Sequence, residues 1–232
     1  AIGLFLGGVA VMVWMERVVR KRRGLAEITT SAIGFRLAAG PRIVALGGGT
    51  GLSTLLRGLK GYTRNITAIV TVTDEGGSSG RLRTEWGVLP PGDVRNCIVA
   101  LAENDSALNR ILNFRFDKGE LAGHSLGNIV LLAVTELAGD FRLAVEEMNK
   151  LLAIRGRVLP VTTEAVTIAG TDSKGNRYRG ELEVARHGRE LKEVSIEPPD
   201  AKPLSEVVEA IREAEAIVLG PGSLFTSILP NL

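Results

Sequence analysis

The chain has 232 residues, 45% of them hydrophobic and only 4% aromatic, with a formal net charge of +2. This length allows one generous domain with a substantial core. The 28 glycines are well above average usage and favour an α/β protein with glycine-rich binding turns over a β-sandwich.

The charge is unevenly distributed. Residues 1–42 hold seven basic and two acidic residues, a net +5, whereas the remainder holds 21 basic and 24 acidic residues, a net −3. The part beyond residue 42 therefore lacks the basic surplus that nucleic-acid binding requires, and we expect no nucleic-acid partner. A single cysteine, Cys97, excludes a disulfide framework and fits a reducing compartment.

The N-terminal segment is predicted to be a membrane anchor. Residues 1–15 are apolar and uncharged, and four consecutive basic residues, Arg20 to Arg23, follow. Fifteen residues are fewer than the ~20 that span a bilayer, although the run can continue upstream. A signal peptide has its charges before the apolar run rather than after it. The positive-inside rule then places everything after Arg17 in the cytoplasm, tethered to the inner face of the membrane. A buried core helix is the alternative.

Three regions are expected: an anchor with its basic segment at 1–23, a linker at 24–41 and a Rossmann-like nucleotide-binding domain at 42–232. The last of these is predicted to be truncated, because the chain stops inside the apolar run "FTSILPNL".

Within the domain, the patterns predict strands and helices in alternation. In chain order they are a strand at 42–46, a glycine turn at 47–51, a helix near 52–60, a buried strand at 65–73 and a second glycine loop at 74–80. Helices follow at 94–103, 106–114, 126–139 and 141–154, then a strand at 156–162 and a hairpin over 164–185. A helix at 202–214, a strand at 215–220 and a glycine turn into a helix at 221–229 complete the series.

This alternation predicts a doubly wound, mostly parallel sheet with helices on both faces and an inserted β-hairpin. Ligands of such sheets bind beyond the carboxyl ends of the strands. Three glycine-rich turns, at 47–51, 74–80 and 220–223, leave strand ends. We therefore expect them to converge on one crevice.

The first turn, "LGGGTGLST", is suited to an anion. Glycines allow close backbone approach, and the following helix offers free N–H groups and the positive end of its dipole. The turn lacks the Gly-Lys-Ser/Thr of a P-loop, and Leu52 stands where the dinucleotide fingerprint has its last glycine. A tight strand–helix turn without a ligand is the alternative.

The second loop, "DEGGSSGRLR", adds charge to this edge. Asp74 follows the second strand, where dinucleotide folds place the carboxylate that binds a ribose hydroxyl. Gly77, Ser78 and Ser79 can cradle an anion, and Arg81 can bind a phosphate bidentately. Asp74 and its neighbour could also recruit a hard cation such as Mg²⁺.

Further polar residues stand at helix starts. Asp93 in "PPGDVRN" is expected to cap a helix, and with Asn96 it can also face the crevice. His124 and Asn128 lie in "GHSLGN", where a structural histidine and a ligand contact are equally plausible. No second histidine stands at metal-ligand spacing, which argues against zinc, and no nucleophile dyad is evident.

The ordered motifs "GGGTGLSTLLRGLK", "VTDEGGSSGRLR", "PPGDVRNCIVALA", "GHSLGNIVLLA" and "GPGSLFTSILPNL" resemble the bacterial gluconeogenesis factor family, in the superfamily of 2-phospho-L-lactate transferase. The resemblance covers about residues 42–232. It implies a Rossmann-like fold that binds a UDP-sugar such as UDP-N-acetylglucosamine. It also implies a regulator of cell shape and wall synthesis during gluconeogenic growth, in a family whose members are not established as enzymes. Where that family usually has a second aspartate, this chain has Glu75, whose extra methylene can shift a metal or ribose contact.

The patterns and the resemblance together predict one set of nucleotide-contacting residues. These are Gly47, Gly48, Gly49, Thr50, Gly51, Leu52, Asp74, Gly77, Ser78, Ser79, Arg81, Asp93, Asn96, His124, Asn128, Gly220, Pro221, Gly222 and Ser223.

Two functions remain open from the sequence. The first is a nucleotide-sugar-binding regulator, with a regulatory protein partner and a homo-oligomeric state expected. The second is a Mg²⁺-dependent phospho-lactyl transferase in which Asp74 and Asp93 are catalytic candidates and Asp74 a metal ligand. A nicotinamide dehydrogenase is disfavoured by the incomplete glycine fingerprint.

Overall fold

The computed structural model describes residues 34–103 and 107–232. The chain divides into two compact units, 1–40 and 41–232. The apolar run predicted as an anchor lies outside the described residues. Among the helices that are described, none is long and apolar enough to cross a membrane. Residues 34–38, inside the predicted linker, are helical.

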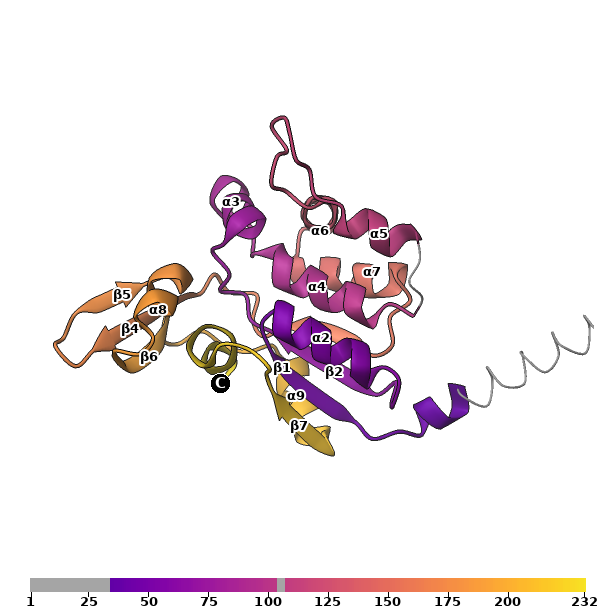
Figure 1. Cartoon of the computed structure of the whole chain (residues 1–232). Coiled ribbons are helices and arrows are strands. Elements are labelled where there is room, and N and C mark those ends of the chain that lie inside the picture. Colours follow the sequence, from indigo (N-terminus) through magenta and orange to yellow (C-terminus); the bar gives the residue numbers. More distant parts are fainter. Residues whose placement is uncertain (1–33, 104–106) are drawn as a thin grey trace, which may run out of the picture. The chain divides into compact units, whose positions relative to one another are not determined.

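The second unit is built on a four-stranded parallel sheet (Figure 1), with the order β3-β2-β1-β7. Its strands are β1 (Ile43–Gly47), β2 (Ile66–Val70), β3 (Arg157–Pro160) and β7 (Ala216–Leu219). β1 pairs with β2 from Ile43↔Ile66 to Gly47↔Val70 and with β7 from Ile43↔Ala216 to Leu46↔Leu219. All five residues of β2 are buried, as expected for a strand covered on both faces.

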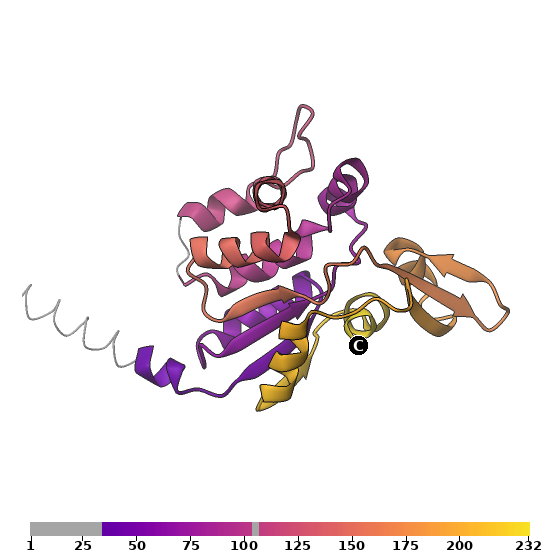
Figure 2. The same ribbon diagram turned by 180° about the vertical axis from the view of Figure 1, so that it is seen from behind.

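Helices cover both faces of this sheet. α2 (Thr50–Leu59), α4 (Pro91–Leu101) and α7 (Phe141–Leu151) lie on one side, with α5 (Ala107–Asn113) and α6 (Leu126–Ala138) further out. α9 (Ser205–Glu213) lies on the opposite side, which Figure 2 brings to the front. The core between the layers includes Leu52, Leu56, Ile69, Ile98 and Met148, each almost fully buried. The mostly parallel α/β architecture predicted from the sequence is confirmed.

The order of the strands places a switch point beside β1. The chain proceeds from β1 to β2 and β3 on one side, whereas β7 adds on the other side of β1. At such a point the connections leave the carboxyl ends of two neighbouring strands in opposite directions and open a crevice. The first and last glycine turns both begin there.

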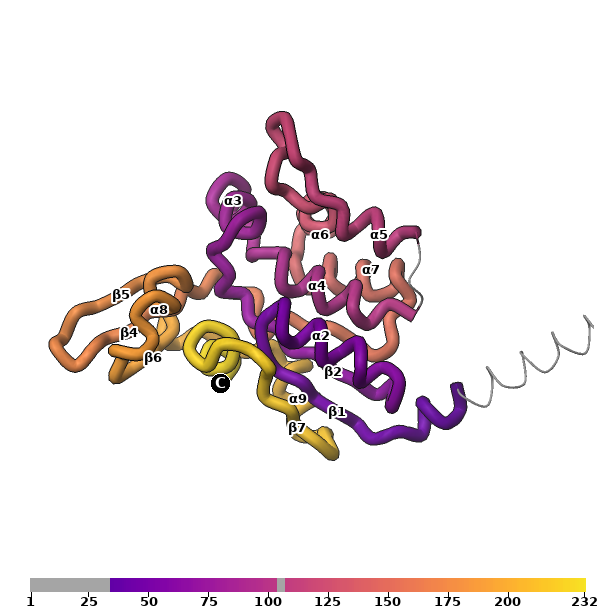
Figure 3. The backbone as a smooth tube through the Cα atoms, viewed as in Figure 1, coloured from indigo at the N-terminus to yellow at the C-terminus, as the bar shows by residue number. Residues whose placement is uncertain are grey.

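The predicted hairpin is larger than expected. Residues 167–197 form an antiparallel sheet of order β5-β4-β6, from β4 (Thr167–Asp172), β5 (Arg177–Arg179) and β6 (Leu191–Glu197), with helix α8 (Glu181–His187) packed on it. Figure 3 follows the chain from β3 into this insert and back to α9. The expectation of a second hairpin strand through residue 185 was wrong beyond Arg179, because the alternating "ELEV" belongs to a helix that buries only Val184.

Two other local predictions need correction. Residues 74–80 are not one open loop, because α3 (Gly77–Trp86) begins inside it despite two glycines and two serines. The segment after Ser223 forms a short π-helical turn (η1, Leu224–Ile228) and a 3-10 turn (η2, Leu229–Asn231) rather than a continuous α-helix.

Candidate functional site

The first and last glycine turns are in backbone contact at the switch point. Gly47 ends β1, Gly48 and Gly49 form the turn, and α2 begins at Thr50. A Cβ added to Gly51 would lie 2.8 Å from the carbonyl carbon of Pro221, and one added to Gly47 would lie 3.8 Å from Cα of Gly220. At Gly51 only glycine permits this approach of the two turns, whereas the distance at Gly47 is an ordinary contact.

α4 contributes a carboxylate to the same place. A Cβ on Gly49 would lie 2.7 Å from Cα of Asp93, and one on Gly48 would lie 3.1 Å from its Oδ2. The Gly49 N–H donates a hydrogen bond to Asp93. Asp93 was expected to cap α4, but the helix begins at Pro91 with Pro90 at the cap, so Asp93 stands in the first turn. Its carboxylate therefore contacts the first glycine turn and does not cap its own helix.

Asp74 extends this acidic group toward the insert. Its Oδ1 accepts a hydrogen bond of 2.8 Å from the Gly76 N–H, and its charge acts on Asp93. Glu181, the first residue of α8, hydrogen-bonds to the Asp74 side chain. The negative charges of Asp74 and Asp93 repel its carboxylate. Three carboxyl groups from α4, the chain after β2 and α8 therefore meet beside the crevice.

The pKa values of two of these three carboxyl groups, those of Asp93 and Glu181, are raised toward neutral pH. Burial, followed by repulsion from Asp74, raises the pKa of Asp93 to about 6, against the opposing pull of the Gly49 N–H and Arg95. Burial raises the pKa of Glu181 to about 7, with a further contribution from the two aspartates. Shifts of this kind are common at binding and catalytic sites and also arise in buried structural networks.

Glu75 has a structural contact that the sequence did not indicate. Its Oε2 accepts the Glu181 N–H at 3.0 Å, while the Glu75 N–H donates to Glu181 Oε2 at 3.2 Å. A Cβ on Gly180 would collide with the Glu75 carboxylate, and Gly180 has φ +94°. The side chain of Glu75 therefore fastens the start of α8 in the insert to the chain that follows β2.

This contact leads to a prediction. Glu75→Ala is expected to cost about 1 kcal/mol of unfolding free energy, as for loss of a helix-capping acceptor, and to speed hydrogen exchange at the Glu181 amide. Glu75→Gln keeps an acceptor and should exchange close to the wild-type rate. The matched control is Glu85→Ala, an exposed carboxylate on α3. Unchanged exchange at Glu181 in the alanine variant would refute the role assigned to Glu75.

The serines of the second loop are engaged within the protein. Ser78 Oγ lies 3.0 Å from His124 Nδ1 and accepts a 3.0 Å hydrogen bond from Asn128 Nδ2. Asn128 Oδ1 accepts from Arg95 Nε at 3.2 Å. Ser79 Oγ accepts the Gly92 N–H at 3.1 Å. These buried side chains join α3, α4 and α6 behind the crevice, so their hydroxyls support its wall.

His124 is buried, and burial, then the charge of Arg81, lowers its pKa. It is therefore neutral at neutral pH. Arg81 itself is exposed and donates to the Ala122 carbonyl at 2.6 Å, away from the first glycine turn. Leu52 is fully buried in the core, so only its backbone can face a ligand.

The remaining predicted residues are on α4 and in the last glycine turn. Asn96 is half-buried on α4, one turn after Asp93. Pro221, Gly222 and Ser223 are exposed, and Ser223 Oγ accepts the Thr226 N–H at 3.3 Å. Ser227, which the sequence did not indicate, packs between the turns, since a Cβ on Gly48 or on Gly222 would come within 2.9 Å of its side chain.

The site offers a ligand two kinds of group. The first-turn N–H groups of α2 have no acceptor within the helix, and such groups suit phosphate oxygens. The second kind is the carboxyl groups of Asp74, Asp93 and Glu181, of which Asp93 contacts the turn itself; they can accept from hydroxyls of a sugar. In the part of the chain that the structure describes, no three His, Cys, Asp or Glu side chains are arranged to hold a metal ion. A Mg²⁺ ion at Asp74 would therefore take most of its ligands from phosphate oxygens and water.

The comparison with family models decides the relationship. A model described as "2-phospho-L-lactate transferase CofD" matches residues 43–232. The chain belongs to the CofD family. The matched range contains all three glycine turns, the acidic group and the insert.

Relatives within this family agree with the resemblance found in the sequence. The chain is 51% identical to the gluconeogenesis factor of Halalkalibacterium halodurans and 50% identical to that of Bacillus subtilis. These alignments cover 82% and 83% of this chain but 59% and 61% of the relatives. The chain thus spans about three fifths of their length.

A solved structure has the same fold. The crystal structure of a UPF0052 family member from Bacillus halodurans superposes with a TM-score of 0.80 at 50% identity, over 83% of this chain and 62% of that one. At this identity the α/β arrangement is shared.

Proposed function

We propose that the chain binds a nucleotide sugar of the UDP-N-acetylglucosamine type in the crevice beside β1 and acts as a regulator. The observation that carries this proposal is the contact of two glycine turns at the switch point of a parallel sheet, with a helix N-terminus on one side and carboxyl groups on the other. The diphosphate would lie on the N–H groups at the start of α2. The carboxyl groups would accept from ribose or sugar hydroxyls.

The regulatory part of the proposal follows from the resemblance and from the names of the relatives, which are gluconeogenesis factors. On this basis we propose a role in cell shape and wall synthesis during gluconeogenic growth. Membrane tethering through residues 1–23 and a homo-oligomeric state belong to the same proposal. Fractionation of the full chain tests tethering, and recovery in the soluble fraction alone would overturn it.

Isothermal titration with UDP-N-acetylglucosamine tests the binding proposal. Asp74→Ala should abolish binding while its melting temperature stays within a few degrees of wild type, because Asp74 is half-buried and its hydrogen bond from the Gly76 N–H is local. Asp117→Ala, which removes an exposed carboxylate, is the control. If the folded wild type gives no heat of binding at saturating UDP-N-acetylglucosamine, the proposal that this compound is the ligand is refuted. Normal binding by the Asp74 variant would refute its placement.

One observation favours a second function, a Mg²⁺-dependent phospho-lactyl transferase. The pKa values of Asp93 and Glu181, about 6 and about 7, suit groups that exchange protons at neutral pH. Incubation with a guanylyl-lactyl donor, a deazaflavin acceptor and Mg²⁺ distinguishes the two proposals. Formation of product would establish the transferase activity. If no product forms and the protein still binds the UDP-sugar, the regulator remains the supported function.

A further inference from the structure

A second cavity lies at the opposite end of the sheet. It has a volume of about 270 Å³ and is lined by the first residues of three parallel strands, including Ile43, Ile66 and Arg157, and by α9. The crevice described above lies at the carboxyl ends of the same strands. The two sites are therefore separated by the length of the sheet, and a ligand in one does not touch the other.

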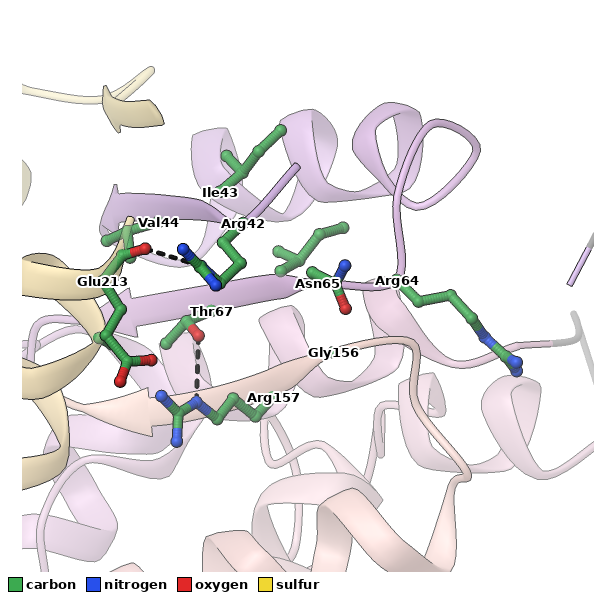
Figure 4. Close-up of a pocket in the computed structure, with 11 residues that line it drawn as sticks. Arg42, Ile43, Val44, Arg64, Asn65, Thr67, Gly156, Arg157 and Glu213 are labelled. Atoms are coloured by element: carbon green, nitrogen blue, oxygen red, sulfur yellow. Dashed lines mark hydrogen bonds between the residues drawn. The ribbon is translucent and has the colours of Figure 1, made fainter. Parts of the chain in front are cut away.

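Two arginines of this cavity are fixed in the same manner. Arg42 Nε donates to the Glu213 carbonyl at 2.8 Å, and Arg157 Nε donates to Thr67 Oγ1 at 3.0 Å (Figure 4). Within the described residues, the terminal nitrogens of both guanidinium groups have no hydrogen-bond acceptor. Each arginine is thus held by one nitrogen, and the edge that binds carboxylate or phosphate bidentately is left available.

The chain before β3 helps to set Arg157 in place. Gly156 has φ +97°, and a Cβ there would come within 3.0 Å of the Ile66 side chain. Glycine therefore allows β3 to start close against β2, which aligns Arg157 with Thr67. The charge of Arg157 also acts on Glu206, which lines the neighbouring cavity.

The other charged residues of the cavity do not neutralise this pair. Arg64 extends away from the other two arginines and forms a 2.8 Å ion pair with Glu103 (Figure 4). The Glu213 carboxylate lines the cavity, but in the described part of the chain it forms no ion pair with Arg42 or Arg157. The lining between them is apolar, from Ile43, Val44, Ile66 and Ala210.

We propose that this cavity binds a small soluble organic anion, a phosphate monoester or a carboxylate, between Arg42 and Arg157. The apolar lining would receive the organic part of the ligand, and the volume of about 270 Å³ restricts it to a small molecule. An effector of this class would bind without competing for the nucleotide crevice.

Nuclear magnetic resonance of the ¹⁵N-labelled full chain with phenyl phosphate as the probe tests this proposal. We expect the arginine Nε–H signals of Arg42 and Arg157 and the amides of Thr67 and Gly156 to shift, while the amide of Gly48 in the crevice does not. Arg157→Ala and Arg42→Ala should each weaken binding about tenfold or more. The affinity of Arg157→Lys should fall between these and wild type, because lysine retains the charge but not the two parallel N–H donors of a guanidinium group.

Two further variants sharpen the result. Glu213→Gln should strengthen binding severalfold, because it removes the negative charge from the lining. Arg110→Ala, which removes an exposed arginine of α5 outside this cavity, should bind like wild type. The proposal is overturned if the shifts are confined to the crevice, if phenol shifts the same signals as strongly as phenyl phosphate, or if folded Arg42 and Arg157 variants bind normally. These readouts come from the amino ends of the strands, so failure here is distinguishable from failure of nucleotide-sugar binding.

Discussion

Gly51→Ala is expected to abolish the proposed nucleotide-sugar binding. The new Cβ would meet the Pro221 carbonyl, 2.8 Å from its carbon atom, so the first and last glycine turns would have to separate. Because the crevice is defined by these two turns, we expect affinity to fall by about a hundredfold or more, equivalent to about 3 kcal/mol. Crowding of this kind should also cost about 1–3 kcal/mol of unfolding free energy.

Gly58→Ala is the matched control for this change. Gly58 lies in the same helix, is exposed and has nothing within 4 Å of an added Cβ. Alanine there should stabilise the protein by about 0.5–1 kcal/mol, because glycine is a poor helix former, and leave binding unchanged. Titration calorimetry and thermal unfolding of the two variants check both effects. Wild-type affinity in Gly51→Ala would show that the ligand does not lie between the turns.

The second large effect concerns pH. In the folded protein the pKa of Asp93 is about 6, against an ordinary value of 3.8, so the folded state holds this proton more strongly than the unfolded state. Its contribution to stability is therefore fully present below about pH 4 and is lost as the pH rises toward about 6. Full loss amounts to about 3 kcal/mol at most for this group.

Glu181 acts in the same direction up to about pH 7. The two effects do not simply add, because both groups interact with Asp74. Carboxyl groups with lowered pKa, such as Asp172 and Glu197, oppose this trend at acid pH, since their contribution is lost as the pH falls. The decline of stability should accordingly be clearest between about pH 5 and pH 7.

Asp93→Asn isolates this effect. Asparagine keeps an oxygen for the Gly49 N–H but carries no charge, so at pH 7.5 the variant should be more stable than wild type by about 1–3 kcal/mol. It should lose affinity for the nucleotide sugar at the same time. Urea unfolding at several pH values measures the first effect, with Asp117→Asn, an exposed loop residue, as the control. A variant with the same pH dependence as wild type would contradict the assignment of the shift to Asp93.

Strand and helix alternation made the parallel sheet predictable. The run at 65–73 is apolar without alternation, and β2 is buried along its whole length. The glycine turns at 47–51 and 220–223 were found because their residue types permit close approach whatever surrounds them. Their contact, however, depends on β7 pairing with β1 across 170 or so residues, which no local pattern specifies.

α3 shows why the prediction of an open loop over residues 74–80 was wrong. Its first residues are poor helix formers. The helix is held in place because Ser78 Oγ hydrogen-bonds with His124 and accepts from Asn128, and Ser79 Oγ accepts from the Gly92 N–H. Tertiary contacts of this kind override local propensity. The same reason explains α8, where Glu75 accepts the first N–H of a segment whose alternation predicted a strand.

The sequence by itself determined the fold class, the family and the three turns at which a ligand can approach the backbone, because these depend on periodicity and on glycine at particular positions. Only the tertiary structure decided which polar residues are brought together beside the first glycine turn and which are not. Asp93 and Glu181 are brought beside Asp74 from distant helices, whereas Ser78, Ser79 and Arg81 are turned to partners within the protein. A side chain with several potential partners takes the one that packing brings within hydrogen-bond distance, and packing is a property of the whole chain.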